Sequence, residues 1–137
     1  MSTAREIMTP DVECVKSTEN LVAAARRMSE LGVGALPICG EDDRLQGIVT
    51  DRDIVIKIVA EELDPAKTKV SEIAEGKPVT VDADADASEV VAIMIENKIR
   101  RVPVIEDKQL VGMISQADIA RSLDPEEVGA LLAALSE

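Results

Sequence analysis

Residues 47–53 read Gly-Ile-Val-Thr-Asp-Arg-Asp, and residues 112–118 read Gly-Met-Ile-Ser-Gln-Ala-Asp. In both stretches a glycine and two apolar residues precede a hydroxyl residue, and an aspartate closes the stretch. An apolar run that ends at a hydroxyl residue followed by an acid predicts a strand that passes directly into a helix. We therefore expect the same strand-to-helix junction twice in one chain.

The similarity between the two junctions extends over most of the chain. Residues 7–38 align with residues 73–104 at an offset of 66 positions, and residues 45–53 align with residues 110–118 at an offset of 65. The one deleted residue falls in a polar stretch, where a hairpin loop tolerates a change in length. The chain is therefore an internal repeat, and a unit of about 60 residues is marginal alone because it buries little apolar surface.

Each copy follows the order β-α-β-β-α. In the first copy we expect strands at residues 13–15, 35–39 and 45–50, and helices that begin near Thr18 and at Asp51. In the second copy we expect strands at residues 79–81, 101–106 and 109–115, and helices that begin near Asp84 and at Gln116. Gly32 is the expected end of the first helix. The residues expected on apolar helix faces are Leu21, Ala24, Ala25, Met28, Leu31, Ile54, Val55, Ile58 and Val59, then Val90, Val91, Met94, Ile95, Ile119, Ala120 and Leu123.

A further helix is expected after Pro125, a residue that suits the first turn of a helix. Val128, Leu131, Leu132 and Leu135 follow at helical spacing and form an apolar stripe. This stripe requires a cover, which is either the body of the same chain or a second subunit.

The repeat predicts an α+β fold in which two tandem β-α-β-β-α units pack as a pseudo-two-fold pair with clefts between them. We expect the first unit, with its N-terminal segment, to span residues 1–62 and a linker to span residues 63–69. The second unit is expected at residues 70–124, followed by a C-terminal amphipathic helix at residues 125–137.

The composition excludes several classes of function. The 137 residues include no His and no aromatic residue, so the chain lacks the usual general acid–base and a stacking platform for single-stranded nucleic acid. A net charge of −12 disfavours binding to a phosphate backbone. Two cysteines without His are too few for a zinc site. We therefore expect no metal, no required cofactor, no nucleic-acid partner and no catalysis.

The longest apolar runs, Leu21–Ala25 and Val90–Ile95, are far shorter than the roughly 20 residues that cross a bilayer. The first six residues are polar or charged apart from Met1 and Ala4, which is unlike a secretory signal. We therefore expect a cytoplasmic protein with no membrane partner.

With Met-Thr-Pro at residues 8–10 and Leu-Pro-Ile at residues 36–38, the two junctions make this chain resemble the CBS domain family. The resemblance covers residues 3–123, and two such domains in tandem resemble a CBS pair, or Bateman module. Residues 50–57 are most similar to those of short stand-alone actinobacterial members. The resemblance implies a regulatory role, a ligand such as AMP, ADP, ATP or S-adenosylmethionine, a homodimer formed through helices, and an unidentified regulated protein.

The hydroxyl residue and the aspartate of each junction have two interpretations. A helix start offers free N–H groups to an anion, and in the family this aspartate holds the ribose. Thr50, Asp53, Ser115 and Asp118 would then contact the ligand. In the alternative, Thr50 and Ser115 are helix N-caps that the aspartates support. The recurrence in both copies favours ribose contact.

Further ligand contacts follow from the resemblance. Adenine would lie against residues near each first strand and beside the central strands, where the alternative for each position is the protein core. The residues implied are Thr9, Pro10, Val12, Ile38, Lys77, Pro78, Val79 and Val104.

Arg100 and Arg101 are candidates for phosphate, because guanidinium groups bind it in bidentate geometry and the family often has His or Arg here. The first copy has Gly34 and Ala35 instead. The two clefts should therefore differ, and the cleft that reaches the arginines should prefer phosphorylated ligands. In the alternative, both arginines pair with acids such as Glu96 or Glu106.

Cys14 and Cys39 fall on strands that the family topology places side by side. A disulfide between them requires Cα atoms within about 7 Å. A reducing cytoplasm favours two buried thiols over a redox-sensitive bridge.

Two functions remain. The leading one is a non-catalytic adenine-nucleotide sensor, and the other is a ligand-free scaffold that acts through dimerisation and partner binding.

Overall fold

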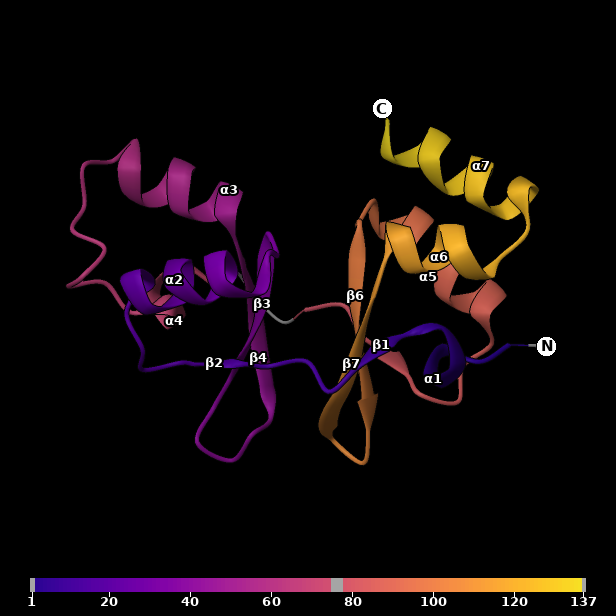
Figure 1. Ribbon diagram of the computed structural model, residues 1–137, viewed down its shortest axis with the longest axis horizontal. Coiled ribbons are helices and arrows are strands. Elements are labelled where there is room, and N and C mark those ends of the chain that lie inside the picture. The colour runs from indigo at the N-terminus through magenta and orange to yellow at the C-terminus, as the bar shows by residue number, and fades with distance from the viewer. Residues whose placement is uncertain (1, 75–77, 137) are drawn as a thin grey trace. The chain divides into compact units, whose positions relative to one another are not determined.

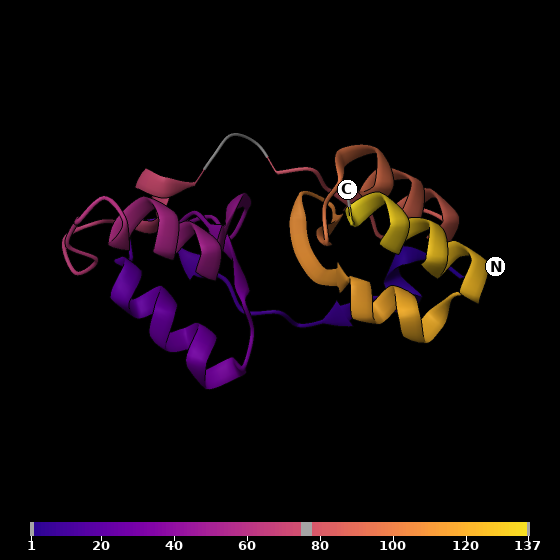
Figure 2. The same cartoon turned by 90° about the horizontal axis from the view of Figure 1, so that it is seen from above.

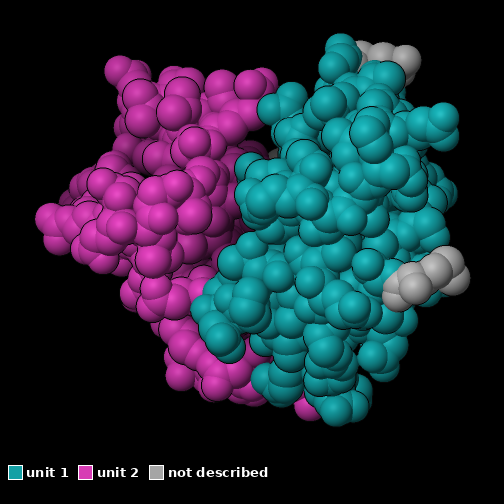
Figure 3. Space-filling model, turned by 45° about the vertical axis from the view of Figure 1, so that its right-hand side comes forward, with its two compact units in different colours: residues 1–12, 79–137 teal, residues 13–78 magenta. Residues whose placement is uncertain are grey.

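The computed structural model describes residues 2–74 and 78–136. The chain forms two compact units, each with strands and helices, which confirms the predicted α+β class. Unit 1 comprises residues 1–12 and 79–137, and unit 2 comprises residues 13–78. Figure 1 labels their helices and strands, and Figure 3 colours unit 1 teal and unit 2 magenta.

Unit 2 contains a three-stranded sheet in the order β2-β3-β4, with β2 parallel and β4 antiparallel to β3. Its strands are β2 (Val15–Lys16), β3 (Ala35–Cys39) and β4 (Leu45–Thr50). Its helices are α2 (Leu21–Leu31), α3 (Asp51–Ile54), the π-helical turn η1 (Val55–Val59) that continues α3, and α4 (Val70–Ile73).

Unit 1 contains a four-stranded sheet in the order β1-β7-β6-β5, in which only the β5–β6 pair is parallel. Its strands are β1 (Thr9–Pro10), β5 (Val81–Asp82), β6 (Arg101–Glu106) and β7 (Gln109–Ser115). Its helices are α1 (Ala4–Ile7), α5 (Ala87–Asn97), α6 (Gln116–Ser122) and α7 (Pro125–Leu135).

The two long hairpins, β3–β4 and β6–β7, have the bounds predicted from the sequence. The short first strands, β2 and β5, begin two residues later than expected, because pairing with β3 and β6 starts only at Val15 and Val81. The helix expected near Thr18 begins at Leu21, because the Asn20 side chain accepts a hydrogen bond from the Ala23 N–H at 2.9 Å and caps it there.

The end of α2 agrees with the prediction, since Gly32 adopts the left-handed conformation with φ 68°. The apolar face of α2 is narrower than expected: Leu21, Ala24 and Met28 are buried, whereas Ala25 and Leu31 are exposed. In η1, likewise, Ile58 is buried but Val55 and Val59 are exposed. Ala120, in α6, is exposed as well.

The compact units do not follow the boundaries of the sequence repeats. The N-terminal segment belongs by sequence to the first repeat, yet β1 pairs with β7 and the Ala4 N–H donates to the Ala85 carbonyl oxygen at 2.8 Å. In the other direction, Val70 and Ile73 of α4 lie in the apolar core of unit 2. The expected spans of residues 1–62 and 70–124 therefore describe the repeats, because each repeat contributes its leading helix to the core of the other unit.

Helix α7 packs on α5 and α6 of unit 1, as Figure 2 shows. Leu131 is fully buried there, and Val128 and Leu135 pack against the same core. The body of its own chain therefore covers most of the predicted stripe. Leu132 is the exception, with 48% of its surface exposed.

Candidate functional site

Both junctions contain a reciprocal capping box at the start of a helix. In unit 1 the Ser115 hydroxyl accepts from the Asp118 N–H at 3.3 Å, and Oδ2 of Asp118 accepts from the Ser115 N–H at 2.9 Å. In unit 2 both corresponding distances between Thr50 and Asp53 are 3.0 Å. The N-cap interpretation is therefore correct for both junctions, and any role toward a ligand is additional to it.

The two aspartates differ in what else they contact. Asp118 is 5% exposed, and its Oδ1 accepts from the Thr9 hydroxyl at 3.1 Å and from Nη2 of Arg121 at 2.6 Å. Asp53 is half-buried, and its Oδ1 lies 3.5 Å from Nζ of Lys57. The carboxylate of Asp118 is therefore more fully occupied by protein donors than that of Asp53.

Arg100 and Arg101 lie directly beside the unit 1 junction. Arg101 is opposite Ser115 in the β6–β7 register, and the carbonyl oxygen of Arg100 accepts from the Gln116 N–H at 3.1 Å. Within residues 2–74 and 78–136, neither guanidinium group has an ion pair or a side-chain hydrogen bond. Both are therefore available to a ligand.

The expected alternative for these arginines was pairing with acids. Glu106 instead accepts hydrogen bonds from Arg5, which also contacts Asp84 at 3.3 Å. The bond from Arg5 lowers the pKa of Glu106, and the bond to Glu106 raises the pKa of Arg5. Glu106 lies at the opposite end of β6 from Arg101 and is paired with Arg5, so it does not neutralise Arg101.

Near the corresponding positions of its junction, unit 2 has an acidic residue where unit 1 has two arginines. Ala35 is opposite Thr50 in the β3–β4 register, and the carbonyl oxygen of Gly34 accepts from the Asp51 N–H at 2.9 Å. A Cβ atom added at Gly34 would lie only 3.0 Å from Oδ2 of Asp51. A carboxylate therefore stands beside Gly34, which is the position that Arg100 occupies in the second repeat.

The segment Thr9–Pro10 of the first repeat lies beside the junction of the second repeat. Strand β1 pairs Thr9 with Met113 and Pro10 with Gly112, which brings the Thr9 hydroxyl to Asp118. Sequence reasoning named these residues separately but did not place Thr9 against Asp118. It also missed Arg121, which its spacing of three residues from Asp118 on a helix could have indicated.

The other expected adenine contacts are placed as follows. Val12, the last residue of the first stretch of unit 1, is half-buried, and so is Pro78, the last residue of unit 2. Val79 packs against the unit 1 core. Ile38 and Val104 are 1% and 0% exposed, so they are core residues in this structure. Lys77 lies outside the described residues.

Cys14 and Cys39 form a disulfide, with Cα atoms 5.7 Å apart. This differs from the two buried thiols that a reducing compartment favours. Cys39 is fully buried in β3, and Cys14 immediately precedes β2. The bond therefore ties the start of unit 2 to its central strand.

No group of three or more His, Cys, Asp or Glu residues that could hold a metal ion occurs within residues 2–74 and 78–136. Over the same part of the chain, no helix is long and apolar enough to cross a membrane.

Comparisons with known proteins bear on these two junctions. The model of the CBS domain family matches residues 4–60 and 70–125. Hypoxic response protein 1 of Mycobacterium tuberculosis is 52% identical over 123 residues, which cover 90% of this chain and 86% of that protein. A crystal structure of Hypoxic Response Protein I with two coordinated zinc ions superposes with a TM-score of 0.83 at 51% identity, covering 90% of this chain and all of that one.

Two further solved structures share the fold. CBSX2 in complex with AMP has a TM-score of 0.77 at 22% identity and covers 89% of this chain and 96% of that one. A hexameric CBS-CP12 protein from bloom-forming cyanobacteria has a TM-score of 0.79 at 34% identity and covers 92% of this chain and 74% of that one.

Proposed function

Because this chain belongs to the CBS domain family, we propose that it is a regulatory module that binds an adenine nucleotide and catalyses no reaction of its own. The family membership and the paired repeat make it a CBS-domain pair, a regulatory module. The choice of an adenine nucleotide rests on the chemistry of the unit 1 junction.

The observation that carries this proposal is that the backbones of Arg100 and Arg101 lie beside the helix start that contains Asp118. Arg100 and Arg101 flank the Ser115–Gln116 helix start, and none of the described side chains neutralises them. In a chain of net charge −12, two arginines at a junction that also contains an aspartate suit a ligand that combines phosphate with a hydroxylated sugar. We assign phosphate to the arginines, ribose to Ser115 and Asp118, and adenine to the Thr9–Pro10 segment.

Ribose binding at Asp118 requires an exchange of partners. Its Oδ1 already accepts from Thr9 and Arg121, so a ribose hydroxyl must replace one of these donors. Arg121 is the easier one to release, because 68% of its side chain is exposed. Released from Asp118, its guanidinium group becomes a third cation near the phosphate.

The unit 2 junction is assigned a weaker role. Thr50 and Asp53 offer the same ribose chemistry, with Pro78 of the same unit as a candidate adenine contact. Asp51 repels phosphate at the position that Arg100 and Arg101 occupy in unit 1. We therefore expect a phosphorylated ligand to occupy the unit 1 junction first.

The comparisons bear on both the ligand class and a metal. CBSX2 was solved with AMP, which supports an adenosine ligand for this fold. The zinc ions of Hypoxic Response Protein I do not transfer, because this chain has no His and its two cysteines are joined in a disulfide. Its residues do not fit a structural zinc centre.

Isothermal titration calorimetry with AMP and adenosine tests the assignment. We expect saturable binding of AMP to the wild type and at least a tenfold loss of AMP affinity in Arg100→Ala/Arg101→Ala, because hydrogen bonds to charged groups contribute about 1.5–3 kcal/mol each. Adenosine affinity should be unchanged in that variant. Asp118→Asn should weaken both ligands, and Asp53→Asn is the matched control. Equal AMP binding by wild type and the double variant would refute the phosphate assignment.

A second function has its own support. Asp118 is saturated by protein donors, as expected of a junction that serves only as a helix start in a ligand-free scaffold. No heat with either ligand, together with an unchanged melting temperature at high AMP concentration, would favour that scaffold. Release of ADP or phosphate from ATP by the purified protein would contradict the absence of catalysis.

We further propose that the protein is cytoplasmic and self-associates as a homodimer, as the hexameric CBS-CP12 relative self-associates. Cell fractionation checks the location. Light scattering coupled to gel filtration checks the mass.

A further inference from the structure

The carboxylate of Asp118 divides its two oxygens between the helix cap and other donors. Oδ2 accepts from the N–H of Ser115 at 2.9 Å and from its hydroxyl at 3.1 Å, so this oxygen belongs to the capping box. Oδ1 accepts from the Thr9 hydroxyl at 3.1 Å and from Nη2 of Arg121 at 2.6 Å. A ligand hydroxyl that leaves the helix cap intact must therefore bind at Oδ1, in competition with Thr9 and Arg121.

The displaced donor determines what this exchange costs. The Arg121 side chain is 68% exposed and is therefore easily displaced, but it is also the counter-ion of a carboxylate that is only 6% exposed. Hydrogen bonds between charged groups are roughly twice as strong as neutral ones. A ribose hydroxyl that replaces Arg121 substitutes a neutral donor for a cationic one. The ligand therefore leaves a buried carboxylate without a counter-ion in contact, which is unfavourable unless another part of the ligand compensates for it.

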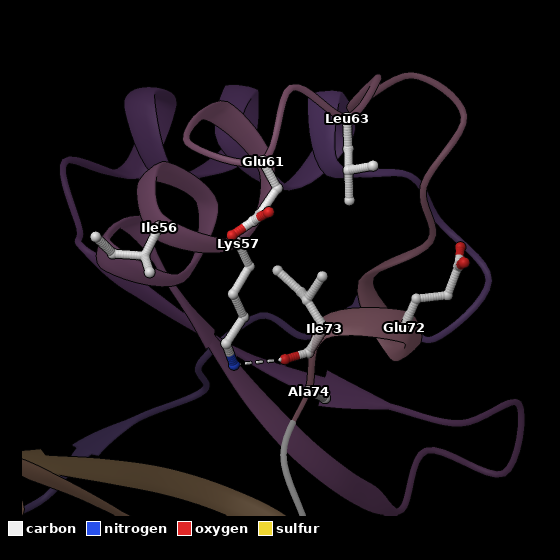
Figure 4. A pocket seen from close by; sticks show the side chains of 7 residues that line it. All are labelled: Ile56, Lys57, Glu61, Leu63, Glu72, Ile73 and Ala74. Carbon is white, nitrogen blue, oxygen red and sulfur yellow. Dashed lines mark hydrogen bonds between the residues drawn. The ribbon is translucent and has the colours of Figure 1, made fainter.

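Unit 2 holds the corresponding cation more firmly. Nζ of Lys57 lies 3.5 Å from Oδ1 of Asp53 and donates to the Ile73 carbonyl oxygen at 3.0 Å. Figure 4 shows Lys57 extending along one side of a hollow, with this hydrogen bond at its end. The Lys57 side chain is 28% exposed, against 68% for Arg121. Lys57 is anchored to the backbone as well as to its aspartate, so it cannot follow a ligand as an exposed arginine can.

The 5′ substituent of the ligand decides whether the lost ion pair is replaced. Arg121 lies one helical turn after Asp118, so its guanidinium group stays beside the junction after release. A phosphate on the 5′ carbon supplies a new anion for that group. Adenosine, which is uncharged, supplies none. S-adenosylmethionine places a sulfonium cation on the same carbon, and the arginines of the junction repel that cation.

We propose that Arg121 is a specificity-determining residue that restricts the unit 1 junction to adenosine ligands with an anionic 5′ group. Paired with Asp118, it disfavours neutral and cationic ligands by competing for Oδ1, and once displaced by a nucleotide it attracts the phosphate. The ligand class is therefore AMP, ADP or ATP and not S-adenosylmethionine. This inference rests on the nucleotide binding proposed above. Arg100 and Arg101 only attract phosphate, whereas Arg121 also penalises ligands that lack it.

Calorimetric competition against AMP tests this selection, because it reports the affinities of adenosine and S-adenosylmethionine at the site that AMP occupies. We expect both competitors to bind the wild type at least about tenfold more weakly than AMP does. In Arg121→Ala both should bind about tenfold more tightly than in the wild type, because one charge-assisted hydrogen bond no longer competes. AMP affinity should change by less than about threefold, since the lost attraction offsets the lost competition. Arg121→Lys retains the cation and should retain the wild-type order of the three ligands.

The direction of the change separates selection from structural damage. Damage to unit 1 would weaken AMP and adenosine together, whereas loss of the selecting cation strengthens adenosine. Lys57→Ala removes the counter-ion of Asp53 and is the matched control, which should leave all three affinities within about twofold of the wild type. Unchanged adenosine affinity in Arg121→Ala, with AMP still bound, would overturn this inference alone and assign the exchange to Thr9. No binding of AMP to the wild type would overturn it together with the proposed function.

Discussion

The two junctions have the same backbone and opposite charge. Both contain a hydroxyl N-cap and a reciprocal aspartate. Next to these shared capping residues, unit 1 has Arg100 and Arg101, whereas unit 2 has Gly34, Ala35 and the carboxylate of Asp51. The shared residues are those that the helix start needs, and the residues that differ are not needed by the fold. In an internal repeat, therefore, the differences between copies point to function more directly than the motif itself.

The largest expected difference between the units concerns the disulfide, which only unit 2 contains. Cys14 and Cys39 are 25 residues apart, and closing a loop of that length contributes about 3.5 kcal/mol in the chain-entropy model. Reduction should therefore speed hydrogen exchange in residues 13–74 by roughly several hundredfold and leave residues 79–136 nearly unchanged, which mass spectrometry can measure. A Cys14→Ser/Cys39→Ser variant should not respond to reductant. Equal acceleration in both units would contradict this.

A second contrast comes from the junction aspartates. Asp118→Ala removes bonds to Ser115, Thr9 and Arg121 from a buried site, so we expect a loss of about 2–3 kcal/mol in unfolding free energy. Asp53→Ala removes mainly a helix cap and should cost about 1 kcal/mol. Urea unfolding followed by circular dichroism measures both. Equal losses would show that the additional contacts of Asp118 add no stability.

The glycines of the two junctions should also differ. A Cβ atom at Gly112 would lie 2.7 Å from the Thr9 carbonyl oxygen and 2.5 Å from Sδ of Met8, so Gly112→Ala must displace β1. We expect a cost of about 1–3 kcal/mol. At Gly47 the nearest atom is Cβ of Ala74 at 3.2 Å, and Gly47→Ala should cost less than about 1 kcal/mol. Equal melting temperatures for the two variants would contradict this difference.

The charge contrast itself can be tested one residue at a time. Arg101→Ala should weaken AMP binding about tenfold, which corresponds to about 1.4 kcal/mol. Asp51→Asn, at the other junction, should change AMP affinity by less than about twofold. Calorimetry measures both, and a larger effect at Asp51 would assign the nucleotide to unit 2 instead.

The smallest expected effect is the dependence on pH. Arg5 lowers the pKa of Glu106, so this pair stabilises unit 1 above the usual glutamate pKa and the contribution is lost as the pH falls. Asp43 raises the pKa of Lys16, so the pair in unit 2 stabilises below the usual lysine pKa and is lost as the pH rises through the folded value. Glu106→Gln should therefore flatten the acid limb, and Lys16→Gln the alkaline limb, of a plot of melting temperature against pH. Exposure of both pairs keeps the effects small.

Elements that depend on a local pattern of apolar and polar residues were the ones best predicted from the sequence. Alternating apolar residues bounded by polar turns predicted both long hairpins to the residue. The start of α2 was missed because Thr18 and Asn20 are both acceptable caps, and only the observed hydrogen bond decides between them. The partner of Glu106 was also beyond reach, because Arg5 arrives from a segment about a hundred residues away. The residue types at the site were thus predictable. The contacts between segments that are far apart in the sequence were not.

The exchange of leading segments has a consequence for how such repeats can be inherited. Unit 1 is built from two separate stretches of chain, and its edge strand β1 is encoded ahead of everything in unit 2. A gene fragment that encodes only the second repeat would therefore specify a sheet without β1 and an Asp118 without Thr9. Recombination that moves single repeats between genes would produce damaged units, so we expect these repeats to be transferred only as pairs. A circular permutant that begins at Glu13 and joins the C-terminus to the N-terminal segment would make each unit contiguous for the first time.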